Sequence, residues 1–263
     1  MPGGLPDWKG VYPALTTAFG PDGAVDEGAV EAHAARMVAE GCAGLVALGS
    51  LGEGATLAAE EKDAVLRAVL RGAAGRVPVV AGIGALATAE AVGLARRAAG
   101  LGCAGLMVLP PFAYSTDAAE MGAHVAAVLE ATDLPAMLYN NPGAYRTDFL
   151  PGEILELAAA HPGLRAVKES SGDVRRITAL RAGAPGRLAL LVGLDDAVVE
   201  GVAAGADGWV AGLVNAFPAE SVALLRLARS ARDGGPRGEL EALQRWFLPL
   251  LRMDGLPKFV QYM

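Results

Sequence analysis

The sequence predicts an α/β fold, a closed (β/α)8 barrel of the TIM type, and three observations support this prediction. Eight apolar runs of strand length alternate with eight stretches of helical periodicity. A related five-residue pattern recurs at 41–45, 102–106 and 205–209, where a glycine ends a helix and a strand follows. The 263 residues also suit one barrel of ordinary size. An open, doubly wound sheet is the competing topology, but it does not need all eight units.

The strands are expected where apolar runs are continuous, as in parallel strands that are buried on both faces. These runs lie at 11–18, 43–48, 77–82, 105–109, 136–140, 164–168, 188–192 and 208–211. The helices are expected between them, at 26–40, 58–73, 87–101, 117–131, 149–160, 173–182, 195–204 and 218–232. Residues 1–232 then form the barrel, and 233–263 form a shortened C-terminal helical segment.

The composition narrows the possible partners and the compartment. Hydrophobic residues make up 53% of the chain and aromatic residues only 5%, so the core must be aliphatic and rich in alanine. The net charge of −7 argues against nucleic acid or an anionic membrane as a partner. No apolar run is long enough to span a bilayer, and the N-terminus lacks the features of a signal peptide. Cys42 and Cys103 are expected to be buried thiols, so a cytoplasmic protein is predicted.

Lys168 and Tyr139 carry the chemical prediction, because the chemistry of such barrels sits at the carboxyl ends of the strands. Lys168 ends the sixth expected strand, and Tyr139 lies at the end of the fifth. Neighbouring strands are about 5 Å apart, so both side chains can face one cavity. Burial disfavours an ammonium group, and a neutral amine attacks a ketone to form a Schiff base. A phenol beside it can shuttle the protons. The alternative is a lysine that only extends to solvent.

Other strand ends carry weaker hypotheses. Thr17 could bridge Tyr139 to the pocket, although threonines are ordinary at strand ends. Asp195 and Asp196 are expected to cap the helix after the seventh strand. Arg175 and Arg176 are expected on an exposed helix face or at a subunit contact. The three histidines fall on or beside outer helices, so no metal site is predicted. Glycines in the last two loops, Gly193 and Gly212, leave a phosphate-binding isomerase barrel as a weaker rival.

Four blocks resemble the dihydrodipicolinate synthase and N-acetylneuraminate lyase family of Schiff-base enzymes: GVYPALTTAF at 10–19, GSLGE at 49–53, YNNP at 139–142 and VKESSGD at 167–173. The resemblance implies that Lys168 forms the Schiff base, that no other cofactor is used, and that Tyr139 shuttles protons. It also implies that Ser50 and the backbone amides at Ser50 and Leu51 hold a substrate carboxylate, and that a strand-eight carbonyl near Val210 lies in the pocket. The implied partners are a small 2-oxo acid and further copies of the chain, as a homotetramer or dimer.

At three positions this sequence differs from the residues that the synthases of the family use for their reaction. Leu51 stands where they carry a second hydroxyl residue, and Phe112 stands where they place a tyrosine that completes a proton relay. The arginine that binds the second substrate follows the strand-five proline closely in the synthases, whereas Arg146 lies beyond an insertion here. Asn141 is expected to satisfy loop backbone rather than to touch the substrate.

The same stretches are similar to 1-pyrroline-4-hydroxy-2-carboxylate deaminases, as are GWVAGLVNAFP at 208–218 and WFLPLL at 246–251. That similarity implies loss of ammonia and water from a cyclic imine to give 2,5-dioxopentanoate, and this deaminase activity is the leading hypothesis. A pyruvate-dependent aldolase or a 4-hydroxy-tetrahydrodipicolinate synthase is the alternative within the family. A non-catalytic sensor that binds a keto acid is the alternative from another class. The family also has a longer C-terminal helical region than 233–263 provides.

Overall fold

Eight parallel strands form one sheet in the computed structural model, which describes residues 4–112 and 117–255. The strands are β1 (Gly10–Pro13), β2 (Leu45–Ala47), β3 (Val79–Ile83), β4 (Gly105–Val108), β5 (Ala136–Asn140), β6 (Leu164–Glu169), β7 (Ala189–Val192) and β8 (Gly208–Ala211). Their order is β1-β8-β7-β6-β5-β4-β3-β2. A parallel bridge between Ala14 and Val46 joins the two ends of this order. The predicted closed barrel is therefore confirmed, and an open sheet is excluded.

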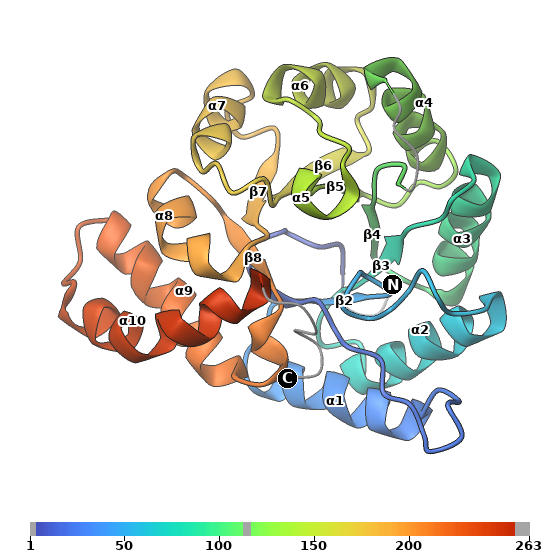
Figure 1. Cartoon of the computed structure of the whole chain (residues 1–263), viewed down its shortest axis with the longest axis horizontal. Helices are drawn as coiled ribbons and strands as arrows, with labels where there is room; N and C mark the ends of the chain where they lie inside the picture. Colours follow the sequence, from blue (N-terminus) through green and yellow to red (C-terminus); the bar gives the residue numbers. More distant parts are fainter. Residues whose placement is uncertain (1–3, 113–116, 256–263) are drawn as a thin grey trace.

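Helices surround the strands in a ring (Figure 1). The α-helices are α1 (Glu27–Ala39), α2 (Ala59–Ala73), α3 (Thr88–Leu101), α4 (Ala118–Leu129), α5 (Pro142–Tyr145), α6 (Pro151–Ala160), α7 (Arg175–Gly183), α8 (Val198–Ala203), α9 (Pro218–Arg232) and α10 (Gly238–Leu251). Three 3₁₀ turns are η1 (Asp195–Ala197), η2 (Leu213–Asn215) and η3 (Arg252–Gly255). No helix among the described residues is long and apolar enough to cross a membrane.

Two layers of apolar side chains form the core, because successive residues of a strand point to opposite faces. One layer fills the barrel and includes Tyr12, Met107 and Ala166. The other layer lies between the barrel and the helices and includes Trp209 and Val167. On β6 this alternation sends Ala166 inward and Val167 outward, so Lys168, two residues after Ala166, also points into the barrel.

The main differences from the prediction lie at the carboxyl ends of the strands. The first strand was expected at 11–18 but ends at Pro13, and the residues after it enter a loop. The short helix α5 was not predicted. Asn141 caps it through a hydrogen bond that its side chain accepts from the Ala144 N–H, and Pro142 occupies the first turn. Figure 1 shows α5 beside β5 and β6, over the middle of the ring.

Helix α10 follows the ring and lies beside α9 (Figure 1). Phe247 is fully buried, and its ring packs edge to face against Phe217 with 5.9 Å between centroids. The division of the chain at residue 232 into a barrel and a C-terminal segment stays a prediction.

Candidate active site

Lys168 and Tyr139 meet inside the barrel, as the strand order predicts. They are register partners across β5 and β6. Both side chains are buried, and the Lys168 Nζ lies 3.8 Å from the centroid of the Tyr139 ring. The amine therefore sits over the face of the phenol ring, where an ammonium form also gains a cation–π contact. Lys168 does not extend to solvent, which removes the alternative explanation of this residue.

Gly193 leaves room for the lysine. A Cβ atom at this position would overlap the Ser170 Oγ atom and would lie 2.8 Å from Lys168 Cε and 2.9 Å from Lys168 Cγ. Real Cβ atoms essentially never approach so closely, so any side chain here would displace Ser170 and also the stem of Lys168 or the loop. Gly193 was a candidate for the loop of a phosphate-binding isomerase barrel, whereas in the structure it packs against Lys168.

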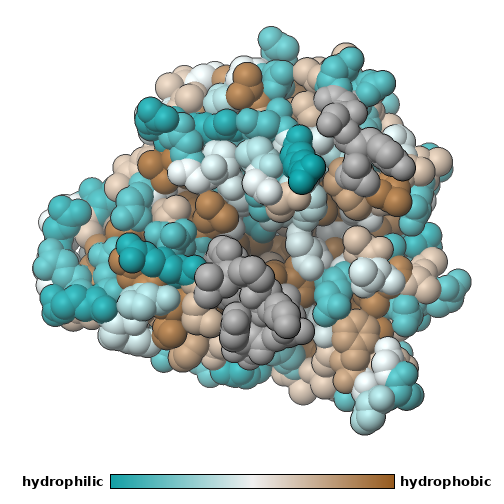
Figure 2. All heavy atoms as spheres, in the orientation of Figure 1, coloured by the Kyte–Doolittle hydropathy of each residue, from teal (hydrophilic) through white to brown (hydrophobic). Residues whose placement is uncertain are grey.

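A cavity of about 180 Å³ opens at the carboxyl ends of the strands, and the molecule is hollowed near the centre of this face (Figure 2). Its lining residues come from most of the strand ends and the loops that follow them: Ala14, Gly49, Ser50, Leu51, Met107, Tyr139, Asn141, Ala144, Lys168, Gly193, Leu194, Val210 and Gly212. Four residues implied by the family resemblance, Lys168, Tyr139, Ser50 and Val210, thus border one space. Most of the wall is apolar, and Leu51 is part of it.

Asn141 fixes the hydroxyl of Tyr139. Its Oδ1 accepts from the Ala144 N–H at 3.1 Å, so its Nδ2 is left to donate to the Tyr139 hydroxyl at 2.9 Å. Because the phenolic oxygen accepts this bond, Tyr139 keeps its own proton to donate. Asn141 was expected to satisfy loop backbone. It does so, and it also holds the phenol and lines the cavity.

The turn after β2 places Ser50 at the cavity. Leu48 and Glu53 flank it in left-handed conformations, with φ of 62° and 55°. Such conformations cost a non-glycine residue about 1 kcal/mol or more, and they recur at functional loops. The Ser50 hydroxyl forms a short hydrogen bond with the hydroxyl of Tyr145, the last residue of α5. No sequence pattern indicates this role for Tyr145.

Three predicted residues lie outside the cavity lining. Thr17 is buried and donates from its hydroxyl to the Gly52 carbonyl at 2.6 Å, so it supports the Ser50 turn rather than Tyr139. Phe112 packs against the Tyr145 ring, with 5.8 Å between centroids. Arg146 is exposed and ends α5 in a left-handed conformation.

Asp195 opens the 3₁₀ turn η1 before α8, and it has partners beyond this turn that were not predicted. Its buried carboxylate accepts from Trp209 Nε1 at 3.0 Å and from the backbone amides of Gly212 and Leu213 at 3.0 and 2.7 Å. These amides belong to the loop after β8, where a phosphate would bind in a phosphate-binding barrel. An internal carboxylate already occupies them, so the structure does not support the phosphate-binding rival.

Arg176 does not lie on a freely exposed face. It forms a bidentate ion pair with Asp148, with N–O distances of 2.6 and 2.9 Å, and holds the pKa of that carboxyl below its usual value. Asn140 links Asp148 to Glu169, which points away from the barrel interior. Burial raises the pKa of Glu169.

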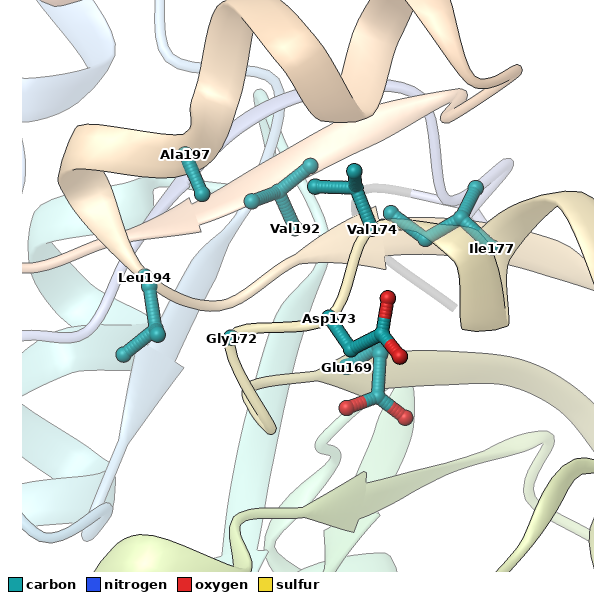
Figure 3. A pocket seen from close by; sticks show the side chains of 8 residues that line it. All are labelled: Glu169, Gly172, Asp173, Val174, Ile177, Val192, Leu194 and Ala197. Carbon is teal, nitrogen blue, oxygen red and sulfur yellow. The ribbon is translucent and has the colours of Figure 1, made fainter.

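Figure 3 shows a second pocket on this outer side of β6, bordered by Glu169, Asp173 and the side chains of Val174, Ile177 and Val192. Its volume of about 10 Å³ is enough for roughly one water molecule. It is therefore too small for a substrate.

Other nucleophiles and metal ligands do not compete with the lysine in the described parts of the chain. Within residues 4–112 and 117–255 no three His, Cys, Asp or Glu side chains are grouped to hold a metal ion. Cys42 and Cys103 are buried as predicted, and burial raises the pKa of both thiols to about 12. Neither thiol supplies a thiolate near neutral pH.

A (β/α)8 barrel whose strand ends enclose a buried amine, a phenol and an apolar cavity belongs to the class of lyases and aldolases that bind substrate as a lysine Schiff base. The chain is a member of the Dihydrodipicolinate synthetase family, which matches residues 7–252. The family predicted from the four sequence blocks is thus confirmed, and so is the class I type of enzyme.

Named relatives and solved structures agree with this assignment. A 4-hydroxy-tetrahydrodipicolinate synthase of Xanthomonas axonopodis pv. citri (strain 306) is 40% identical over 227 residues, which cover 86% of this chain and 74% of the relative. Dihydrodipicolinate synthase from Aquifex aeolicus has a TM-score of 0.89 at 27% identity, over 95% of this chain and 84% of that one. The chloride-inhibited synthase of Acinetobacter baumannii, complexed with pyruvate, has a TM-score of 0.89 at 29% identity, over 97% and 87%.

Proposed function

We propose that Lys168 forms a Schiff base with a small 2-oxo acid such as pyruvate. The observation that carries the proposal is the Lys168 amine, which lies 3.8 Å from the centroid of the Tyr139 ring and lines the cavity at the strand ends. The neutral amine attacks the ketone carbon, and the nitrogen gives up one proton as the substrate oxygen gains one, which yields the carbinolamine. Tyr139, whose hydroxyl Asn141 holds, then donates the proton with which the carbinolamine hydroxyl leaves as water, and the second proton of the nitrogen restores the phenol. The substrate carboxylate lies at Ser50 and the amides beside it.

Among the specific activities within the family, the comparisons favour that of a 4-hydroxy-tetrahydrodipicolinate synthase, since relatives at 35–40% identity carry this name. In this reaction the enamine formed from bound pyruvate attacks an aldehyde that carries a carboxylate. The structure of a relative complexed with pyruvate supports the same first substrate.

Deamination of 1-pyrroline-4-hydroxy-2-carboxylate is the second candidate, and the cavity wall favours it. Leu51 gives the wall an apolar side chain, and Phe112 brings a ring without a hydroxyl against Tyr145. Arg146 is exposed, outside the lining residues, where it does not meet the carboxylate of a second substrate. A cyclic imine already contains all the carbon atoms of the product, so its deamination needs no second carbon substrate.

One assay separates the two. The purified chain is given either pyruvate with an amino-acid aldehyde or the hydroxyproline-derived imine, and 4-hydroxy-tetrahydrodipicolinate and ammonia are measured. A synthase forms the first product only, and a deaminase releases ammonia only. Binding of pyruvate, seen as a higher melting temperature, with neither product would favour a keto-acid sensor. Lys168→Ala is the control and should form neither product.

The quaternary structure belongs to the same proposal. We expect a homo-oligomer, a tetramer or a dimer, in the cytoplasm. Size-exclusion chromatography with light scattering gives the mass of the assembly directly. A mass equal to that of one 26.7 kDa chain would contradict the expectation.

A further inference from the structure

Tyr145 connects three parts of the cavity wall. Its hydroxyl bonds to Ser50 after β2. Its ring meets the ring of Tyr139 edge to face, with 5.7 Å between centroids and 87° between planes, and it also contacts the ring of Phe112, which lies outside the lining. Helix α5, which carries Tyr145, is itself anchored by Asn141, the residue that bonds to the Tyr139 hydroxyl.

The polarity of the bond between Ser50 and Tyr145 follows from the chemistry of the two hydroxyls. A phenol is a much stronger acid than an aliphatic alcohol, so it is the better donor in a bond that they share. Burial raises the pKa of Tyr145, first of all by desolvation and then through the neighbouring Tyr139, so the phenol stays protonated. With Tyr145 donating, the proton of Ser50 is directed elsewhere.

Ser50 is exposed where it lines the cavity, so its proton can be donated to a group bound there. Among the described lining residues only Ser50 and Tyr139 carry hydroxyls, and only Lys168 carries a basic group. The amine reacts with the ketone carbon, so the carboxylate of a 2-oxo acid depends on Ser50 and nearby amides for hydrogen bonds.

We infer that Tyr145 is a positioning residue that makes Ser50 a committed hydrogen-bond donor to the substrate carboxylate and so sets the preference for 2-oxo acids over uncharged ketones. This inference rests on the proposed function. Tyr145 acts through Ser50 and does not itself take part in bond making. The inference assigns a specificity role to α5, an element that contains no lining side chain except Ala144.

The test compares two ketones in the full-length protein. Borohydride traps the imine, and the trapping rate at low ketone concentration is measured for pyruvate and for acetone, which lacks the carboxylate. In Tyr145→Phe the rate for pyruvate should fall about tenfold, the order of one oriented hydrogen bond to an ion. The rate for acetone should stay within twofold. Ser50→Ala should show the same pattern, and Tyr145→Phe should add nothing to it in the double variant.

Tyr12→Phe is the matched control, because Tyr12 is another buried phenol inside the barrel but does not line the cavity. It should leave both rates unchanged. Equal losses for pyruvate and acetone in Tyr145→Phe, or independent effects in the double variant, would overturn the inference while the proposed function stands. Absence of trapping in the unmodified protein would instead overturn the proposed function, and the inference with it.

Discussion

Gly193 shows how a single residue without a side chain controls the placement of Lys168. Its backbone lies so near Lys168 that a Cβ atom would approach Cε to 2.8 Å. The lysine side chain therefore lies between the Tyr139 ring and the loop after β7. Composition and periodicity cannot reveal this contact, because it depends on how that loop packs against β6.

Gly193→Ala should displace the amine and slow imine trapping with pyruvate at least tenfold, since small misplacements of a reacting group are costly. Overpacking should also lower the free energy of unfolding by about 1–3 kcal/mol, so trapping is measured on protein shown to be folded by circular dichroism. Gly93→Ala is the control. A Cβ atom there meets nothing within 4 Å in α3, so trapping should be unchanged and stability equal or higher. Unimpaired trapping in Gly193→Ala would contradict the proposed packing.

At the scale of elements, the parts predicted correctly are those that follow from periodicity and adjacency. Eight alternating units place β5 beside β6, and this adjacency alone brings Tyr139 to Lys168. The parts missed are loops. Tyr145 follows an Asn-Pro pair that signals a helical turn, and that signal could have placed the turn but not its contact with Ser50. The bonds of Asp195 to the loop after β8 were missed because the two loops meet only in the folded barrel.

Asp195 joins the loops after β7 and β8, and its removal should destabilise the barrel. Asp195→Ala leaves the indole of Trp209 and two buried amides without their acceptor. The free energy of unfolding should fall by about 3 kcal/mol, as is usual when one partner of a buried charged network is lost. Asp196→Ala, at an exposed neighbour, should change it by less than about 0.5 kcal/mol. Urea unfolding measures both, and similar losses would refute this role for Asp195.

The ion pair between Asp148 and α7 should make stability depend on pH. Arg176 lowers the pKa of Asp148, so this contribution is complete above the carboxyl's unfolded pKa and is lost as the pH falls through the lower folded value. Asp148→Asn should therefore reduce the free energy of unfolding by about 1 kcal/mol at pH 7. The gap to the unmodified protein should narrow below about pH 4. Asp133→Asn, on an exposed turn, is the control, and a gap that does not vary with pH would exclude the ion pair as its cause.

At the scale of the whole molecule, the candidate site exists only because the sheet closes. Ser50, Tyr139, Lys168 and Val210 are spread over much of the chain and meet because β1 pairs with β8 and bridges to β2. The four sequence blocks predicted the family, and the alternating strands and helices predicted the closed barrel. The family model and the solved structures confirm both. The choice between condensation and deamination depends on a few wall residues, which is why the overall sequence resemblance does not decide it.

The most direct measurement of the central claim is mass spectrometry of the protein after borohydride reduction in the presence of pyruvate. A covalent adduct should appear on the peptide that contains Lys168 and should be absent from Lys168→Arg. Tyr139→Phe should form the same adduct about 100-fold more slowly, because the proton donor is lost. An adduct on a different lysine, or none with any 2-oxo acid tested, would contradict the account.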